Sequence, residues 1–517
     1  MLSKYFKGYL QRAAAIGLSA LLLTACQPTP DTEAIVQKED INKVVEKYAD
    51  DGDDAGAGAA PSSDSVDDPG AGDKDVSGDT AADGTSGTAA AALRQSIGAP
   101  EATSFSVPIT NVGTGTTTIT AENVPVILPD VDKLGSAAVV RSDLSAEQVK
   151  AIAEKFLDGR TAYELGPDTK EDYMKQIQSQ QEAYQDYLNQ GMTEEELEDM
   201  QEMIDELQQK MANAPAKADV VLQPTVFEWK AFEGVPGLES IYGNNNENGI
   251  SYTVSAQREA SFFMLSLSKY EENQKNHDFI SKESLLGSQS EGGISTQTIE
   301  NVFSQQACKY TESQAVDLCL QFLQEEGIDT TALAVSSIIP YVQYNYETGE
   351  LTGTGVGSYE IILTHGVGGV AQTWTNNDIR YVSSEENDGK VAYDYECMRL
   401  NVDDTGVTSF YWQNPMAMGE TLADKVNLKP YEEIEEIICQ HIGLAYENYS
   451  MDERLRNGES LDVDHITLGM MRIQNQNDEN NYTLIPVWDV FSKQLGSYSL
   501  VTVNAMDGSI IVRENGY

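Results

Sequence analysis

Histidine is scarce in this 517-residue chain, which contains His277, His365, His441 and His465 and no others. None of them stands in an HExxH or HxxH pair, so a zinc site or a Ser/His catalytic relay would have to assemble from distant segments. The GxSxG motif that presents a nucleophilic serine is also absent from the sequence. The sequence therefore predicts no catalytic residue, no metal site and no cofactor, and we expect a protein that is not an enzyme.

Basic residues are few as well: 33 Lys and Arg stand against 83 Asp and Glu, and the formal net charge is −50. Nucleic acids and anionic lipid surfaces are polyanions, so this charge argues against either as a surface partner. It favours cations, basic proteins or simple solubility in a negatively charged cell envelope. With so many acids, carboxylate pairs arise everywhere by chance, so no pair is singled out as that of a glycoside hydrolase.

Cysteine is limited to five residues, with no CxxC motif and no Cys/His zinc spacing. Cys26 follows an apolar run near the N-terminus. Cys308, Cys319, Cys397 and Cys439 stand in apolar settings, and we expect them to be small buried side chains. A disulfide between two of these four is the alternative, because the exterior of a cell is oxidising.

The apolar run at residues 13–25 is too short for a lasting transmembrane helix, because thirteen residues at about 1.5 Å each cannot cross about 30 Å of hydrocarbon. Basic residues precede the run, which ends in Leu23-Thr24-Ala25-Cys26, the pattern of a lipobox. We predict a lipoprotein signal peptide over residues 1–25 and a lipid on the Cys26 thiol. An ordinary secretory peptide with an incidental Cys26 is the alternative.

This prediction places the protein on the outer face of the cytoplasmic membrane of a Gram-positive bacterium, held to the membrane through the Cys26 lipid. Residues 26–100 are then an acidic linker rich in Asp, Gly, Ala and Ser, which we expect to be disordered because it has little apolar surface to bury. Residues 73–84 mimic the start of an EF-hand calcium loop, but Gly84 stands where a bidentate Glu is needed. We interpret them as a solvated spacer, and we expect order to begin near Ser104.

Residues 101–300 are expected to form an N-terminal α+β unit. A strand is predicted over 116–127, and Ser145 and Gln148 form a capping box that begins a helix. Residues 168–212 read as a helical hairpin broken at Gly191, with a second capping box at Thr193 and Glu196. The predicted seam consists of Leu197, Met200, Ile204, Leu207 and Met211 facing Tyr173, Ile177, Tyr184 and Leu188. The hairpin either packs against its own domain or serves as an arm that binds a partner.

Residues 301–425 and 426–517 share a plan, with helices predicted at 311–327 and 430–448 and four strands after each helix. Two hairpins, at 399–410 and 500–511, turn through Asp and Gly. We align Leu318, Cys319 and Phe322 of the first helix with Ile438, Cys439 and Ile442 of the second. The fold class is therefore predicted as α+β, with a duplicated helix-on-antiparallel-sheet unit.

The segments 482–488 (YTLIPVW) and 501–510 (VTVNAMDGSI) resemble the ending of PepSY-like and YycH/YycI-type extracytoplasmic modules. That resemblance implies cystatin-like α+β units, and the YycH/YycI-type proteins are accessory regulators of a cell-wall sensor kinase. The layout that follows the lipobox is similar to a domain-of-unknown-function family of Gram-positive lipoproteins. This chain departs from the regulators because it is predicted to carry a lipid in place of a transmembrane helix.

Two further motifs have features of binding sites. Residues 366–371 fit a loose GxGxxA pattern, but no apolar helix start follows to meet a phosphate, so a flexible turn is expected. An aromatic set could line a glycan-binding face, although sheet core is the more common role of such residues. This set consists of Tyr341, Tyr344, Tyr346, Trp374 and Trp412.

Three functions remain open from the sequence. The first is a non-catalytic lipoprotein that binds a protein partner in the cell envelope and regulates it. The second is a lipoprotein that binds a glycan or a small ligand. The third is an extracellular hydrolase, which lacks support from any nucleophile or metal-ligand pattern.

Overall fold

The computed structural model describes most of the chain from residue 40 onward. Among its helices, none is both long enough and apolar enough to span a membrane. The described residues are 40–50, 88–111, 115–189, 191–193, 197–232, 235–260, 262–271, 278–287, 294–346, 348–375, 395–445, 460–475, 478–493, 496–513 and 516.

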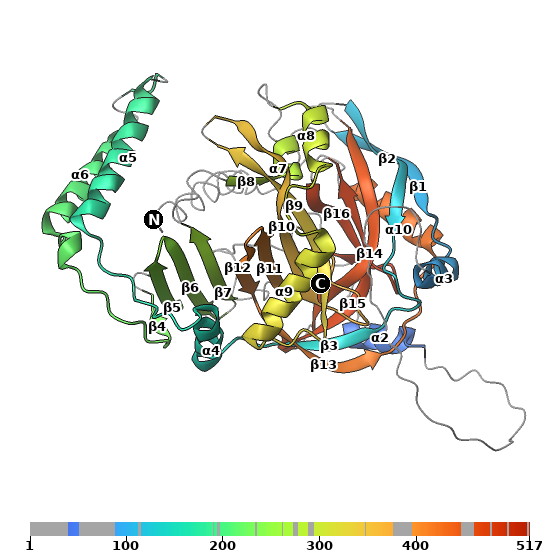
Figure 1. The fold of residues 1–517 in the computed structure, drawn as a ribbon. Coiled ribbons are helices and arrows are strands. Elements are labelled where there is room, and N and C mark those ends of the chain that lie inside the picture. The colour runs from blue at the N-terminus through green and yellow to red at the C-terminus, as the bar shows by residue number, and fades with distance from the viewer. Residues whose placement is uncertain are drawn as a thin grey trace, which may run out of the picture.

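The fold is α+β and is built on two β-sheets (Figure 1). One sheet has nine strands, all antiparallel to their neighbours. Their order across the sheet is β4 (Lys230–Ala231), β5 (Glu239–Glu247), β6 (Ile250–Glu259), β7 (Phe262–Glu271), β12 (Gly406–Gln413), β11 (Cys397–Asp403), β10 (Glu350–His365), β9 (Leu333–Asn345) and β8 (Asp278–Ser281).

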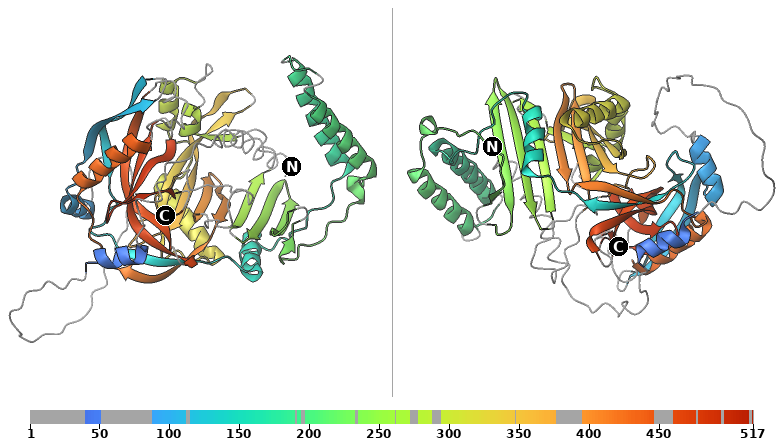
Figure 2. Two further views of the ribbon diagram at one scale, coloured as in Figure 1. Left: turned by 180° about the vertical axis from the view of Figure 1, so that it is seen from behind. Right: turned by 90° about the horizontal axis from the view of Figure 1, so that it is seen from below.

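The other sheet has eight strands and curls like half a barrel (Figures 1 and 2). Along one edge, β15 pairs first with β3 through residues 481–484 and then with β16 through residues 487–492, so the sheet branches there. β2 and β14 run parallel. The main path is β1 (Ala102–Asn111), β2 (Gly115–Ile127), β14 (Leu461–Asn475), β15 (Asp478–Ser492), β16 (Gly496–Asn504) and β17 (Ile510–Ile511), and the branch is β3 (Ser136–Arg141) with β13 (Met416–Ala423).

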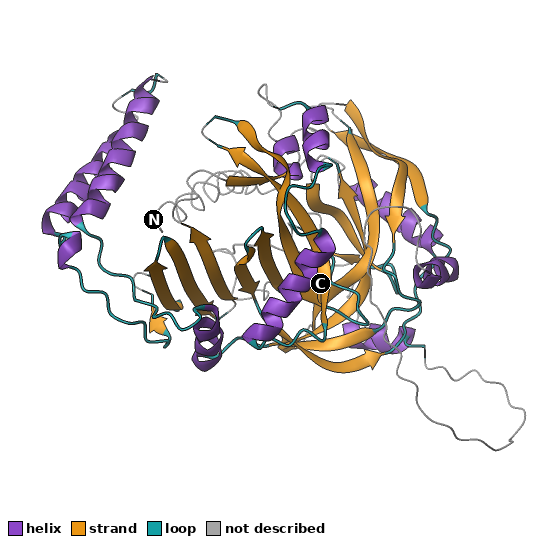
Figure 3. Ribbon diagram, in the orientation of Figure 1, coloured by secondary structure: helices purple, strands orange, loops and turns teal. Residues whose placement is uncertain are grey.

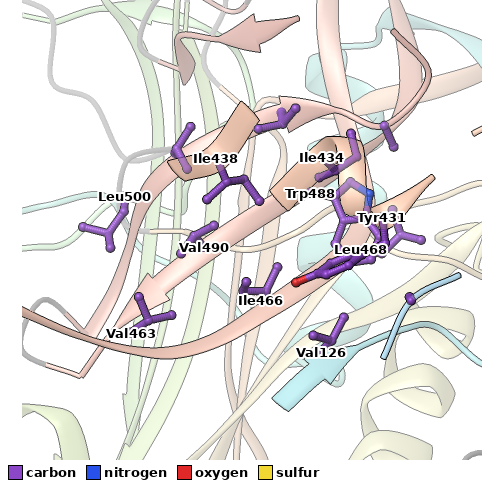
Figure 4. Packing of buried hydrophobic residues seen from close by; sticks show 14 of the residues in the cluster. Val126, Tyr431, Ile434, Ile438, Val463, Ile466, Leu468, Trp488, Val490 and Leu500 are labelled. Carbon is purple, nitrogen blue, oxygen red and sulfur yellow. The ribbon is translucent and has the colours of Figure 1, made fainter. Parts of the chain in front are cut away.

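Helix α10 (Tyr431–Ala445) covers the curled sheet with one apolar stripe. Ile434, Ile438 and Ile442 recur every fourth residue and are fully buried. They pack with Trp488 of β15, whose ring meets that of Tyr431 edge to face at 5.2 Å (Figure 4). Of the three residues predicted for this face, Ile438 and Ile442 are buried, whereas Cys439 is only partly buried.

Helices α4 (Ala146–Phe156) and α9 (Glu312–Glu326) cover one face of the nine-stranded sheet (Figure 3). Phe156 meets Tyr252 of β6 edge to face at 5.8 Å, and Phe322 meets Phe410 of β12 at 5.9 Å. A smaller core joins α7 (Lys282–Gly287) and α8 (Thr296–Phe303) to β8 and β9.

Local capping fixes where several helices begin. Ser145 and Gln148 cap α4 reciprocally, as predicted, and Thr311 and Gln314 do the same for α9. Gly327 ends α9 in the left-handed conformation, with φ of 85°. The capping box expected at Thr193 and Glu196 cannot be placed, because Glu196 lies outside the described residues.

Part of the predicted linker is folded, which corrects the expectation of disorder over residues 26–100. Helix α2 (Ile41–Tyr48) buries Ile41, Val44 and Val45 against the curled sheet, and helix α3 (Thr88–Ile97) adds Leu93 and Ile97 to the core beneath α10. Three apolar residues on one face are enough to dock α2 on the sheet. The average composition of the segment does not reveal this local pattern.

The equal burial predicted for the two aligned helices is wrong, and the buried positions differ by one residue. α9 buries Ala315, Cys319 and Leu323, whereas Leu318 and Phe322 are only partly buried. Cys319 therefore corresponds to Ile438 of α10. Each helix precedes four consecutive antiparallel strands, β9–β12 or β14–β17. Their contacts differ, because α9 lies on β10, β11 and β12 while α10 lies on β1 and β16.

Strands from residues 101–300 enter both sheets. β2 pairs with β14 and β3 pairs with β15, whereas β7 pairs with β12. The two cores are therefore each assembled from segments that lie far apart in the sequence.

Candidate functional site

The most prominent surface feature is a helical hairpin, which we call the arm, formed by α5 (Lys170–Asn189) and α6 (Glu198–Asn213). The two helices pack on each other, and in the described part of the chain neither packs on a strand of either sheet. The arm extends away from both sheets in all views (Figures 1 and 2). The predicted hairpin is confirmed, and its helices pack on each other rather than on the sheets.

The arm is held together by a short apolar seam. Ile177 of α5 and Ile204 of α6 are buried, as is Leu197 immediately before α6. The other members of the predicted seam are partly buried: Tyr173, Tyr184, Leu188, Met200, Leu207 and Met211. This seam is the contact through which the two helices of the arm pack on each other.

Two extended segments, residues 160–169 and 214–229, join the arm to the nine-stranded sheet. The Thr225 N–H donates to the Ala162 carbonyl at 2.9 Å, and Tyr163 exchanges two backbone hydrogen bonds with Asn244 of β5 at 2.7 and 2.9 Å. Across the join, Lys230 and Glu164 form an ion pair at 2.5 Å, whose hydrogen bond lowers the pKa of Glu164. Backbone pairing therefore sets the position of the arm.

Side chains at the base of the arm fasten its first turn. The Thr169 hydroxyl donates to the Asp172 carboxylate at 2.6 Å, and this hydrogen bond lowers the pKa of Asp172. Glu171 accepts from the Lys217 N–H at 2.9 Å, which joins the start of α5 to the chain beyond α6. Glu171 also accepts from its own N–H, and together these bonds lower its pKa. The base is therefore built to keep its carboxylates charged.

The outer surface of the arm is both acidic and apolar. Residues 168–213 contain thirteen acids and three bases. Met174 and Met203 are 59% and 48% exposed, and Tyr187 and Met192 are 40% and 38% exposed. Flexible methionines on a surface adapt to the shape of a partner, and exposed apolar side chains gathered on one feature mark interaction sites. A shallow depression along α5 is lined by Gln178, Gln181, Glu182, Gln185 and Asp186.

A buried His–Glu pair lies where the two sheets meet. The His365 Nδ1 and Glu396 Oε2 atoms are 2.7 Å apart, and the Glu396 side chain is fully buried. Glu396 also accepts from the Trp412 Nε1–H at 3.2 Å and the Met416 N–H at 3.0 Å. Burial lowers the pKa of His365, but the Glu396 charge and hydrogen bond outweigh it, so the pKa is raised. The carboxylate thus joins β10, β12 and β13 as a structural cross-link.

A second buried ion pair lies at the end of the curled sheet. The Arg513 Nη2 and Asp489 Oδ2 atoms are 2.7 Å apart, and both side chains are almost fully buried. Asp489 also accepts from the Thr502 hydroxyl at 2.5 Å and the Ser499 hydroxyl at 2.8 Å. These partners satisfy a charge that would otherwise be costly to bury. In the described part of the chain no three His, Cys, Asp or Glu side chains gather as a metal site.

The candidate residues singled out in the sequence are not brought together. Cys26, His277 and the calcium-like segment 73–84 lie outside the described residues. In the described part of the chain no disulfide joins the four other cysteines, of which Cys308 and Cys319 are buried and Cys397 and Cys439 partly buried. His441 and His465 lie apart, on α10 and β14, and burial lowers the pKa of His441.

The glycine-rich motif at residues 366–371 and the aromatic set have structural roles. Residues 366–371 form a tight turn in which Gly368 and Gly369 adopt positive φ, as expected. Of the aromatic set, Trp412 belongs to the core of the nine-stranded sheet, and Tyr344 packs on Tyr346 at 4.8 Å. Tyr341 donates to Glu360 at 3.1 Å, and Trp374 lies over the Arg399 guanidinium. The five aromatic residues therefore do not line one surface.

Comparisons with known proteins add little to this geometry. No protein-family model and no curated protein matches the chain. Among solved structures, the chain is similar to an uncharacterized protein from Eubacterium rectale, with 15% sequence identity and a TM-score of 0.28. The match covers 53% of this chain and 76% of that protein's chain. A TM-score of that size supports no argument about fold or function.

Sequence reasoning missed both buried ion pairs. His365 and Glu396 are 31 residues apart and the Asp489 and Arg513 partners are 24 apart. Nothing local distinguishes these carboxylates from the other acids of the chain. An Asp or Glu inside an apolar strand pattern, as in the segment 484–491, is the signal that identifies such a residue.

Proposed function

We propose that the chain is a non-catalytic, extracytoplasmic lipoprotein that binds a protein partner in the cell envelope through the arm. The observation that supports this proposal is the placement of the arm, which stands free of both cores with Met174, Met192 and Met203 exposed. A segment that contributes to neither core has no need of these side chains for folding, so a partner accounts for them better than stability does.

The charge of the arm indicates the chemistry of the partner. Thirteen acids against three bases favour a basic surface, and the exposed Met174, Met203 and Tyr187 favour an apolar patch within it. Opposite charges speed the encounter and the apolar contacts slow dissociation. A basic protein surface with an apolar centre fits both requirements.

We propose further that the two helix-and-meander units are PepSY-like and that the protein regulates its partner. Supporting this, α9 and α10 are each followed by four antiparallel strands in chain order. The lipobox at residues 23–26 supports attachment to the outer face of the cytoplasmic membrane through the Cys26 lipid. In this arrangement the anchor holds the protein near envelope partners, and the arm makes the contact.

Site-specific crosslinking tests the proposal. A photoreactive amino acid is placed at Met203 of the arm in the full-length protein, expressed in its own cells, and products are identified by mass spectrometry. We expect one dominant crosslinked protein. Tyr498, which is 48% exposed on β16, serves as the matched control position. The same products from both positions, or none from Met203, would contradict binding through the arm.

A further inference from the structure

The nine-stranded sheet has two unlike faces. On β5, β6, β7 and β12 the residues alternate between buried and partly exposed, as strands covered on one side do. α4 and α9 reach only the buried face, through the ring contacts of Phe156 with Tyr252 and of Phe322 with Phe410. The alternate residues of these four strands therefore make up the outer face of the sheet.

Most of the outer face of these four strands is uncharged, and we call this uncharged part the polar face. Glu259 at the end of β6 and Lys230 of the neighbouring β4 lie on the same side, at its margin. Charged residues make up 22% of the chain, and strands that face solvent normally use them for solubility. Solubility therefore does not explain this composition. The polar face consists of Ser240, Tyr242, Asn244 and Asn246 of β5, Thr253, Ser255 and Gln257 of β6, Met264, Ser266, Ser268 and Tyr270 of β7, and Ser409 and Tyr411 of β12. Ser251 of β6 and Gln413 of β12 lie on the same side of the sheet but are buried.

Hydrogen bonds hold several of these side chains in fixed positions. The Asn244 amide donates to the Thr253 hydroxyl at 3.1 Å, between neighbouring strands. The Tyr411 hydroxyl donates to the Gln413 amide oxygen at 3.0 Å. Side chains fixed in this way present donors and acceptors in set directions, which is what a site for a polar ligand requires.

Two tyrosines flank the centre of the polar face in one row across the sheet. Tyr242 pairs with Ser255, Ser255 with Ser266, and Ser266 with Tyr411. Three strand spacings put the two tyrosine backbones about 14 Å apart. Burial raises the pKa of Tyr242 to about 12, so its phenol is neutral at physiological pH. The row therefore has small hydroxyl side chains between two aromatic rings.

We propose that the polar face binds a neutral oligosaccharide. Sugar hydroxyls match the Ser, Thr and Asn groups as donors and acceptors, and the apolar C–H faces of sugar rings stack on tyrosine. Charge complementarity favours a neutral ligand, because the acidic chain repels polyanions and the outer face of the four strands offers a cation only the Glu259 carboxylate at its margin. At the border of the polar face, Arg399 and Glu360 neutralise each other across a 3.0 Å ion pair. This inference does not depend on partner binding by the arm.

Calorimetric titration of the full-length protein with the hexamers of N-acetylglucosamine, β-1,4-glucose and α-1,4-glucose tests the proposal. We expect saturable binding of at least one of them. The double substitution Tyr242→Ala and Tyr411→Ala should weaken it about tenfold, equivalent to about 1.4 kcal/mol. Ser266→Glu, which keeps both rings but places a charge in the row, should weaken binding to a similar extent.

The matched control is Tyr346→Ala, an exposed tyrosine beyond the end of β9 and outside the polar face, which should bind like the wild type. Circular dichroism checks that each variant is folded. The proposal is overturned if none of the three hexamers binds, or if folded Ser266→Glu binds as well as the wild type. It is also overturned if sedimentation shows a dimer of the wild type that Ser266→Glu dissociates, since a second copy of the chain would then occupy the face.

Discussion

At the C-terminal end of α9, Glu326 lies in an unfavourable setting for a charge. The residue is 7% exposed, its Oε2 atom has no hydrogen-bond partner, and the helix dipole at that end disfavours an anion. Burial raises the pKa of Glu326 to about 7, although nearby Lys155 acts in the opposite direction. A group with this environment titrates near physiological pH.

We predict that Glu326→Gln stabilises the protein at pH 8 and has little effect at pH 5. The folded pKa lies above the unfolded one, so wild-type stability falls as the pH rises from about 4.5 through about 7. At pH 8 the substitution should raise the free energy of unfolding by about 1–3 kcal/mol. Urea titrations at both pH values measure the difference, and an equal effect at pH 5 and pH 8 would show that ionisation is not the cause.

At the scale of single elements, the helices are the part of the fold that the sequence predicts best. The spacing of Ile434, Ile438 and Ile442 and the capping pairs Ser145–Gln148 and Thr311–Gln314 act within a few residues of one another. Their consequences are therefore visible without the tertiary structure. The one-residue shift between α9 and α10 shows the limit of such prediction. Leu318 and Cys319 are both apolar, and only the packing of the helix determines that Cys319 is fully buried and Leu318 partly buried.

We predict that Ile438→Ala lowers the free energy of unfolding by about 2–5 kcal/mol, from lost transfer energy and the cavity left behind. Leu444→Ala on the same helix is the control, because Leu444 is 72% exposed and its truncation should change stability by less than about 0.5 kcal/mol. Denaturant unfolding of both variants measures the contrast. Similar losses in the two would mean that α10 does not present the described face to the core.

Helix α2 gives a second prediction for one element. Val44 is 3% exposed and packs against Met471 and Ile485, and Asn42 accepts from the Thr483 hydroxyl at 3.0 Å. Val44→Asp would bury an unpaired carboxylate, so it should destabilise the docked helix by about 1–3 kcal/mol. We expect limited proteolysis to cut the α2 region faster in this variant, while Lys43→Asp, on the exposed side, leaves the rate unchanged. Equal rates in all three proteins would contradict the docking of α2.

For the whole molecule, the distribution of charge and apolar surface determines the functional proposals. The formal charge of −50 is compatible with any fold, but it favours basic partners over acidic ones. On the arm, acidic residues lie beside exposed methionines. The polar face shows the opposite composition, with charge only at its margin. Two surfaces of such different chemistry are suited to two different ligands.

The predicted anchor is tested at the same scale. We expect Cys26→Ala to prevent lipid attachment, because the Cys26 thiol is the group that is acylated in a lipobox. Labelling of cells with a fatty-acid analogue should mark the wild type and not the variant, and membrane fractions should retain less of the variant. Equal label on the two proteins would refute the lipobox assignment at residues 23–26. Cys439→Ala, which leaves Cys26 in place, serves as the control.

The sequence by itself determined the α+β class, the helical hairpin and the starts of α4 and α9, because each depends on residues within a turn or two of one another. The tertiary structure decided the rest. Strands of residues 101–300 pair with strands more than a hundred residues away, as β7 does with β12 and β2 with β14. The polar face is completed by the pairing of β7 with β12, and the buried His365–Glu396 pair joins residues 31 apart. Side-chain chemistry shows which residues can meet, but the register between distant strands selects the ones that do.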